Sequence, residues 1–357
     1  VYLLCRLLQR LGEHRLAMAA CALLVCDATF VFKARCDSGP VAVQWLLCVA
    51  GFYCWVRYRS WPWALAAGVC WGLGLWDKIT FFWILFGISA GALAGLRIPW
   101  RAIPVAALGF LLGVYPFLAH NVKTEWSAFR VEGTRELTGA VLRPKTEALW
   151  HTMNGRPLFG SMVMTDGPAS PVDNAVVRIG KFFGEPTSSF FAWLVVAGVL
   201  LGWRHRFYRF AVIALFAGFA PMALASGGGW APHHLGLLWP LPHLIAAMGL
   251  LAMPSLLARA ALVVVLFSQL LVINQHYSFL IRFGGDMAWT DAIRPLSERI
   301  RKDPEVSYRF LDWGVYDAAY MFTRGNRAMR VGLPADEEDW TAYLYVQHPE
   351  GFIAMGD

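Results

Sequence analysis

The sequence predicts an α-helical polytopic membrane protein of about nine transmembrane helices, with a small α/β soluble domain at its C-terminus. Hydrophobic residues make up 57% of the 357 residues and charged residues only 15%, a balance far from the soluble average. Apolar runs of nearly membrane-spanning length follow one another through most of the chain. We therefore predict two groups of transmembrane helices (1–120 and 190–276), an outer-face loop with short amphipathic helices (121–189) and an outer-face α/β domain (277–357).

Most of the apolar runs approach the roughly 20 residues that a helix needs to cross a bilayer, and the sixth and ninth are shorter. The predicted spans are Leu16–Phe32, Pro40–Val56, Trp61–Trp76, Ile79–Leu96, Ile103–Ala119, Phe190–Trp203, Phe210–Ala225, Leu235–Ala252 and Ala260–Ile273. One side of this arrangement receives eleven arginines in its short connections, whereas the other receives only Lys33, Arg35 and Lys78. The first side is therefore predicted to be cytoplasmic, and 121–189 and 277–357 are predicted to lie outside.

The net charge of +7 does not indicate a nucleic-acid partner. Outside 121–190 and 277–357, 14 Lys and Arg residues face only four acids. A basic surplus confined to short connections between apolar runs is typical of membrane orientation. The seven cysteines all lie within the first 70 residues and have neither metal-ligand spacing nor the pattern of a disulfide framework. We expect free cysteines, no metal and no cofactor.

Asp77 and Lys78 alone separate the third predicted span from the fourth, within CWGLGLWDKITFFWILF. An acid and a base at such a joint are costly in hydrocarbon, so they lie at a water boundary or pair with each other. One interpretation is a charged hairpin tip. The other is that Lys78 binds an anionic group where membrane meets water.

A second outer-side cluster is KARCDSG, which contains Lys33, Arg35 and Asp37. Asp37 is either the cap of the helix that begins near Pro40 or an acid that binds or deprotonates an acceptor. In the second case Lys33 or Arg35 contacts phosphate, which cationic side chains suit. Asp27, inside its span, is a weaker candidate, since an intramembrane acid is a functional-site hypothesis by default.

A third outer-side cluster is SGGGWAPHHLGLLWPLPH, in which His233 and His234 begin a span. Adjacent histidines point to different faces of a helix, so a shared metal is not expected. Interfacial packing and binding of a phosphate or sugar both remain open for this pair. Asn121 marks the outer end of the fifth span, where an Asn is often only a helix stop.

The two outer segments have local signals of their own. Thr146–Met153 suits an amphipathic helix, and helices on the membrane surface are expected from the aromatic residues Trp126, Phe129, Trp150, Phe159, Phe182 and Phe183. In the tail, the helices are predicted at Thr290–Arg301 and Asp317–Phe322, and the strands at Ser307–Leu311 and Tyr343–Gln347.

Several stretches together resemble bacterial membrane glycosyltransferases of the C type, the branch with protein mannosyltransferase and aminoarabinose-transferase relatives. The stretches are VYLLCRLLQRLGEHRLAMAACALL, FKARCDSGP, GLGLWDKITFFWIL, Asn121 after the fifth span, His233–Pro240 and FLDWGVYDAAYMF. Arg35 and Asp37 are one residue closer than in the family's outer turn, and Gly74–Leu75 lead to Lys78 as in its Gly-Leu-x-x-Leu-x-Lys joint. The resemblance covers most of the chain, and it rests on the order of the motifs.

The resemblance implies that a sugar leaves a polyprenyl-phosphate carrier for a glycan, lipid or protein acceptor outside the bacterial inner membrane. It implies that Lys78 is a lipid-phosphate ligand, that Asp37 is a secondary acid of the site, and that His233 and His234 line its mouth. The family's principal catalytic acid lies upstream of the region matching Val1, so we expect an N-terminally incomplete chain that is inactive by itself.

Two alternatives stay open at this stage. One is a transporter or flippase for a lipid or an anionic solute, against which the chain shows no inverted repeat and few charges inside its spans. The other is a non-catalytic membrane scaffold whose outer tail binds a partner.

Overall fold

The computed structural model describes residues 1–35, 41–58, 60–96, 98–126, 142–167, 169–224, 231–285, 293–302, 308–310, 313–325, 329–331 and 343–344. The chain divides into two compact units. The first comprises Val1–Pro157 and Pro186–Ile273, and the second comprises Leu158–Glu185 and Asn274–Asp357.

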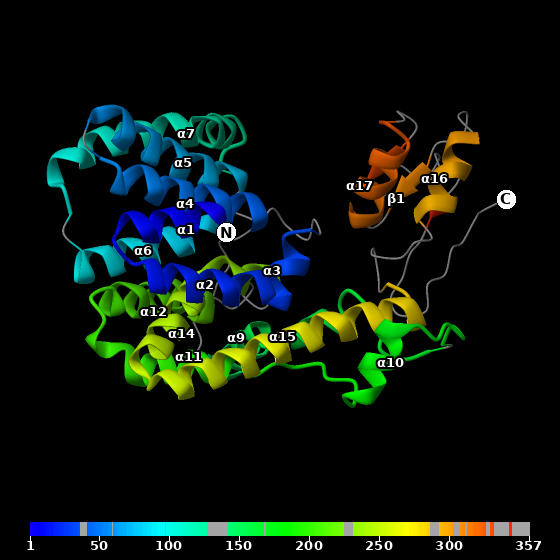
Figure 1. The fold of residues 1–357 in the computed structure, drawn as a ribbon. Helices are drawn as coiled ribbons and strands as arrows, with labels where there is room; N and C mark the ends of the chain where they lie inside the picture. Colours follow the sequence, from blue (N-terminus) through cyan, green and yellow to red (C-terminus); the bar gives the residue numbers. More distant parts are fainter. Residues whose placement is uncertain are drawn as a thin grey trace. The chain divides into compact units, whose positions relative to one another are not determined.

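The first unit is built from helices whose order follows the predicted runs (Figure 1). They are α1 (Tyr2–Arg10), α2 (His14–Cys26), α3 (Ala28–Lys33), α4 (Val41–Val56), α5 (Trp61–Asp77), α6 (Phe81–Gly95), α7 (Ile103–Lys123), α9 (Leu142–Met153), α11 (Phe191–Leu201), α12 (Tyr208–Leu224), α13 (Pro232–Leu235), α14 (Leu241–Ala252) and the larger part of α15 (Ser255–Phe283). Short 3-10 turns occur at Trp100–Ala102, Arg156–Leu158, Gly202–Arg204 and Gly236–Leu238.

Within the described part of the chain, two helices are long and apolar enough to cross a membrane, Trp100–Lys123 and Ser255–Phe283. A third is added if Pro232–Leu238 and Leu241–Ala252, which meet at a bend of 50°, form one broken span. Shorter apolar helices are His14–Cys26, Val41–Val56, Phe81–Gly95, Phe191–Arg204 and Tyr208–Leu224. This mostly helical, apolar architecture is consistent with the predicted class of helical membrane protein.

Two predicted spans differ from the observed helices. Leu16–Phe32 was predicted as one run, but the chain leaves the helix at Asp27, whose backbone is extended (φ −68°, ψ 117°), and starts again as α3. Leu235–Ala252 is interrupted before α14, at a cis peptide bond between Trp239 and Pro240. In both places the mean hydropathy of the run does not reveal the break in the backbone, because the residues around the break are themselves apolar.

Glycines bring neighbouring helices of the first unit into close contact. Gly68 and Gly72 of α5 face the backbone of α7 so closely that an added Cβ would overlap Ala106 O or Phe110 O. Gly87 of α6 lies in the same way against α12. Small residues at helix contacts are typical of helices that associate in membranes, where close backbone packing replaces the hydrophobic effect.

The second unit contains α10 (Ala175–Phe182), the end of α15, α16 (Ile293–Lys302), β1 (Tyr308–Phe310), α17 (Trp313–Phe322), β2 (Met329–Val331) and β3 (Tyr343–Leu344). The three short strands are parallel, in the order β2-β1-β3. A separate apolar cluster joins α16, α17 and two of the strands through Ile300, Tyr308, Phe310, Val315, Ala319 and Met329. Strand β2 is not among the predicted strands.

Candidate functional site

Four basic residues from three separate segments gather in the first unit, and we call them the basic cluster: Lys33, Lys78, His233 and His234. Lys33 is the last residue of α3 and is 5% exposed. Lys78 follows α5, and its charge and that of Lys33 both act on the ring of His233. The His233 and His234 rings lie 4.2 Å apart, and His234 lies edge-on to Trp83 at 5.7 Å. Each of the three clusters identified in the sequence thus contributes at least one side chain to the basic cluster.

Helix α3 holds Lys33 in this cluster although it has only six residues. Asp27, fully buried, caps α3 by accepting a hydrogen bond from Phe30 N at 2.6 Å. Its second carboxylate oxygen lies 3.3 Å from Nε2 of His243, which is also fully buried and belongs to α14. A buried acid is tolerated when its oxygens are satisfied in this way. Asp27 therefore fixes the start of the helix that ends in Lys33.

Three other elements hold the same helix. Gln269 Oε1 of α15 accepts from Ala28 N at 3.2 Å, and Thr29 Oγ1 donates to Thr152 O of α9 at 2.6 Å. The rings of Phe30 and Trp45 of α4 stack at 4.8 Å. Helices of six residues are not stable by themselves, so these contacts determine where α3 lies. Sequence reasoning singled out Asp27 but missed His243 and Gln269, whose local sequence is that of an ordinary apolar span.

The joint between α5 and α6 places Lys78. Its backbone is extended (φ −157°, ψ 131°), and its N–H donates to Gly74 O at 3.3 Å. The buried Gln44 of α4 donates through Nε2 to Lys78 O at 3.4 Å. Asp77, the last residue of α5, is exposed. The joint is therefore anchored to α4, with Lys78 half-buried and Asp77 toward solvent.

The remaining predicted site residues have different settings. Arg35 is exposed just after α3, and Asp37 lies outside the described residues. Asn121 is fully buried near the end of α7, and its Nδ2 donates to Phe117 O of the same helix at 2.9 Å. The buried Oδ1 of Asn121 accepts no hydrogen bond from the residues that the structure describes, and the helix continues past Asn121 to Lys123.

A buried lysine that the sequence analysis did not single out lies in α9. Lys145 is fully buried, and its Nζ donates to Met222 O of α12 at 2.7 Å. Helix α9 also packs against α13, which carries the histidine pair. The sequence shows only a lysine within an amphipathic helix. Its burial follows from the packing of α9 on α12 and α13, for which no local signal exists.

Three apolar cavities follow α4 and form what we call the apolar path. The first has a volume of about 240 Å³ and is lined by Phe30 and Ala34, on either side of Lys33 in sequence. It shares Val49 with a second cavity of about 110 Å³, which in turn shares Phe52 and Val56 with a third of about 730 Å³. The residues of α4 that line the three cavities run from Ala42 to Val56, most of the length of this helix.

The arrangement suits a ligand with an anionic end and a long apolar end. Positive side chains stabilise an anion where water is partly excluded, and the path offers apolar surface to a hydrocarbon chain. Among the described residues, no group of three or more His, Cys, Asp or Glu side chains is placed to hold a metal ion. No protein-family model, curated protein or solved structure matches the chain.

Proposed function

We propose that this chain is part of a glycosyltransferase that moves a sugar from a polyprenyl-phosphate carrier to an acceptor outside the membrane. The observation that carries the proposal is the position of Lys33. It belongs to the basic cluster and lies beside Ala34, which lines the first cavity of the apolar path. A polyprenyl phosphate requires both features together, because its phosphate is anionic and its tail is a long hydrocarbon.

In the proposed reaction, Lys33 and Lys78 bind the phosphate of the carrier and stabilise the negative charge that grows on it as the sugar departs. The acceptor hydroxyl attacks the anomeric carbon while the bond from that carbon to the phosphate oxygen breaks. A carboxylate takes the hydroxyl proton, and Asp37, in the motif KARCDSG, helps to bind or deprotonate the acceptor as a secondary acid of the site. The products are the glycosylated acceptor and polyprenyl phosphate.

The other predicted residues have supporting roles in this proposal. Arg35, next to α3, gives a further positive charge for the phosphate or sugar, and His233 and His234 line the mouth of the site. Asp77 acts on Lys78 by reducing the local positive charge. Asn121, near the outer end of α7, takes part in binding the substrate. The acceptor is a glycan, a lipid or a protein.

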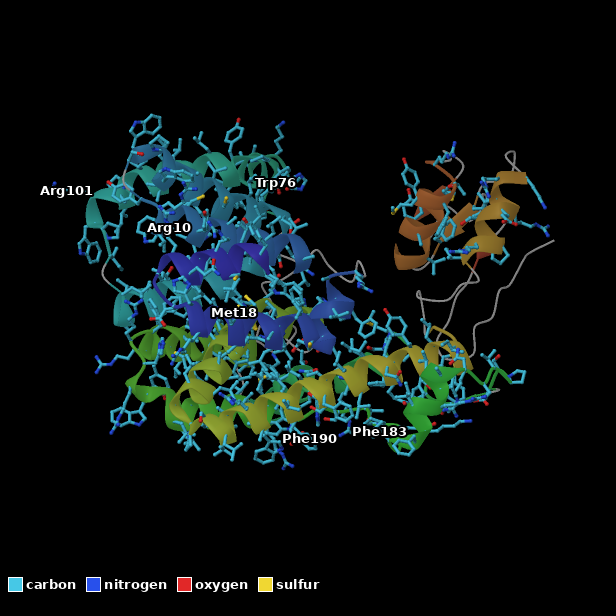
Figure 2. The ribbon with its side chains drawn as sticks, viewed as in Figure 1. Arg10, Met18, Trp76, Arg101, Phe183 and Phe190 are labelled. Atoms are coloured by element: carbon cyan, nitrogen blue, oxygen red, sulfur yellow. The ribbon has the colours of Figure 1, made fainter. Side chains whose placement is uncertain are left out.

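The proposal includes a membrane topology. We propose nine spans in the bacterial inner membrane, a cytoplasmic N-terminus of this chain, and an α/β domain at 277–357 on the outer side. In Figure 2, Arg101 lies at one end of the first unit and Trp76, next to Asp77, at the other. This supports the assignment, because arginines of the predicted cytoplasmic connections and the Asp77–Lys78 joint must lie at opposite ends.

The test uses full-length protein in lipid nanodiscs, supplied with a panel of polyprenyl-phosphate-linked hexoses and aminopentoses and with candidate acceptors. Release of polyprenyl phosphate, measured by mass spectrometry, is the expected result. Lys78→Ala is expected to lower the rate about 100-fold, the usual effect of removing one stabilising group from a developing anion. Lys302→Ala, an exposed lysine of α16, is the matched control and should leave the rate unchanged.

Two results would contradict the proposal. A rate that Lys78→Ala leaves unchanged removes Lys78 from the site. Transfer of intact sugar-linked carrier between the leaflets of a proteoliposome, with no sugar released, supports a flippase instead. Binding of polyprenyl phosphate alone is measured by native mass spectrometry. This measurement distinguishes a variant that no longer binds the carrier from one that binds it but no longer transfers the sugar.

A further inference from the structure

Helix α10 of the second unit has one face fixed to α15. Its buried residues are Val177 and Gly180, and an added Cβ at Gly180 would overlap the side chain of Gln275. Asn274 Nδ2 donates to Val176 O at 3.0 Å. These contacts lie on the first residues of α15 that belong to the second unit, 274–278.

The opposite face of α10 is apolar and exposed. Phe182 is 82% exposed and Ile179 is 43% exposed, and Phe183, directly after the helix, is 42% exposed. The Phe182 and Phe183 rings contact each other edge to face at 4.9 Å, and Phe183 is labelled in Figure 2. A helix on the surface of a soluble protein buries its apolar stripe, but α10 presents these side chains outward.

The position of α10 along α15 relates this face to the membrane. Helix α15 is one continuous helix of 29 residues, long and apolar enough to cross a membrane. The span predicted in it ends at Ile273. The polar residues Asn274, Gln275 and His276 follow at once. Helix α10 therefore contacts α15 at the polar residues that directly follow the predicted span.

Charges near α10 are largely paired with one another. Arg178 lies 3.0 Å from Asp173, and Arg282 pairs with Glu185. These pairs are locally neutral and leave Lys181 as the further charge of α10 itself. A single lysine is attracted only weakly to anionic lipids, so this attraction is not the main force available to α10. The main force is apolar burial, because aromatic side chains at a helix surface partition into the boundary between headgroups and acyl chains.

From these observations we propose that α10 lies in the lipid–water interface of the same bilayer, with Ile179, Phe182 and Phe183 inserted among the lipids. Apolar burial, and not lipid charge, holds it there. The inference rests on the membrane-spanning character of α15 and is independent of the proposed transferase reaction. It assigns α10 the role of a lateral anchor for the segment that leaves the membrane at the end of α15.

The test is photo-cross-linking of the full chain in nanodiscs, with p-azidophenylalanine in place of Phe182. The matched control has the same group in place of Tyr320, an exposed aromatic residue of α17. We expect phospholipid adducts several-fold more abundant at 182 than at 320, in phosphatidylcholine alone and in mixtures with phosphatidylglycerol, and at low and high salt.

Three outcomes would overturn the inference. Equal lipid labelling at 182 and 320 means that α10 is not preferentially in the interface. A protein–protein adduct at 182 means that a second copy of the chain covers this face. Adducts that form only with phosphatidylglycerol and disappear at high salt mean that lipid charge, and not apolar burial, holds α10.

Discussion

Helices α3 and α10 are both too short to be stable alone, and the molecule holds them in opposite ways. Four other elements (α4, α9, α14 and α15) contact α3, largely through buried polar groups such as the Asp27–His243 pair. Helix α10 is hydrogen-bonded to α15 through Asn274 and packs on it through Gly180. Helix α3 is thus held by several other elements, whereas α10 keeps an apolar face exposed.

This difference relates to what each helix carries. Helix α3 ends in Lys33, whose distance from Lys78 and His233 matters if the basic cluster binds one phosphate, so polar anchors with directional geometry are useful there. Helix α10 carries phenylalanines that need only an apolar medium, and a lipid surface does not require a fixed geometry. Variants that each remove one contact of α3 or α10 therefore distinguish a helix held by directional polar contacts from a helix held by apolar burial.

Removal of the Asp27 carboxylate is expected to have the largest effect on stability. Asp27→Ala leaves His243 buried without its partner and uncaps α3, at a cost of about 3–5 kcal/mol in the free energy of unfolding. Chemical denaturation in detergent measures this loss. Asp173→Ala, which removes the exposed partner of Arg178 beside α10, is the matched control, and a similar loss in both variants would contradict the difference between the two helices.

Closing the space at Gly180 is expected to release α10. In Gly180→Leu the new side chain overlaps Gln275 and crowds Ser278, and overpacking of this kind costs about 1–3 kcal/mol. Hydrogen exchange of residues 175–182 should accelerate, while exchange in α3 stays unchanged. Ala175→Leu adds the same side chain on the exposed face and serves as the control. Acceleration in both helices would show that they are coupled.

The sequence predicts the apolar helices well and their interruptions poorly. Most apolar helices are recognisable because their buried and exposed residues are both apolar, so composition alone reveals them. The break between α2 and α3 is not recognisable from the sequence. The burial of Asp27 at this break depends on its contact with His243, which lies 216 residues away in the chain. The burial of Lys145 likewise depends on Met222 in another helix. Such pairings have no local signal.

The grouping of the basic cluster was accessible from sequence for a different reason. Counting basic residues on alternate sides predicts that Lys33, Lys78 and the histidine pair lie on one side, and the structure brings Lys33 and Lys78 within electrostatic range of His233. Their roles stay predictions. The apolar path could not be predicted, because cavities depend on how side chains of α1, α4, α6 and α14 fit together.

A smaller effect is expected from one hydrogen bond of α3. Thr29→Val keeps the shape of the side chain but removes the donor to Thr152 O, at a cost of about 1 kcal/mol. Thr146→Val removes a similar bond, to Leu142 O, on the exposed surface of α9 and is the control. Thermal unfolding of both variants provides the comparison, and equal shifts would mean that the buried anchor contributes no more than an exposed one.

The smallest effect is expected at the ion pair beside α10. The hydrogen bond from Arg178 lowers the pKa of Asp173 below its ordinary value of 3.8. A carboxyl group with a lowered pKa contributes stability above its unfolded pKa and loses it as the pH falls through the folded pKa. Arg178→Gln should therefore raise the pKa of Asp173, as followed by NMR of labelled aspartate, and leave unfolding near neutral pH unchanged because exposed pairs contribute little. A clear loss of stability at neutral pH would instead make this pair an anchor comparable to those of α3.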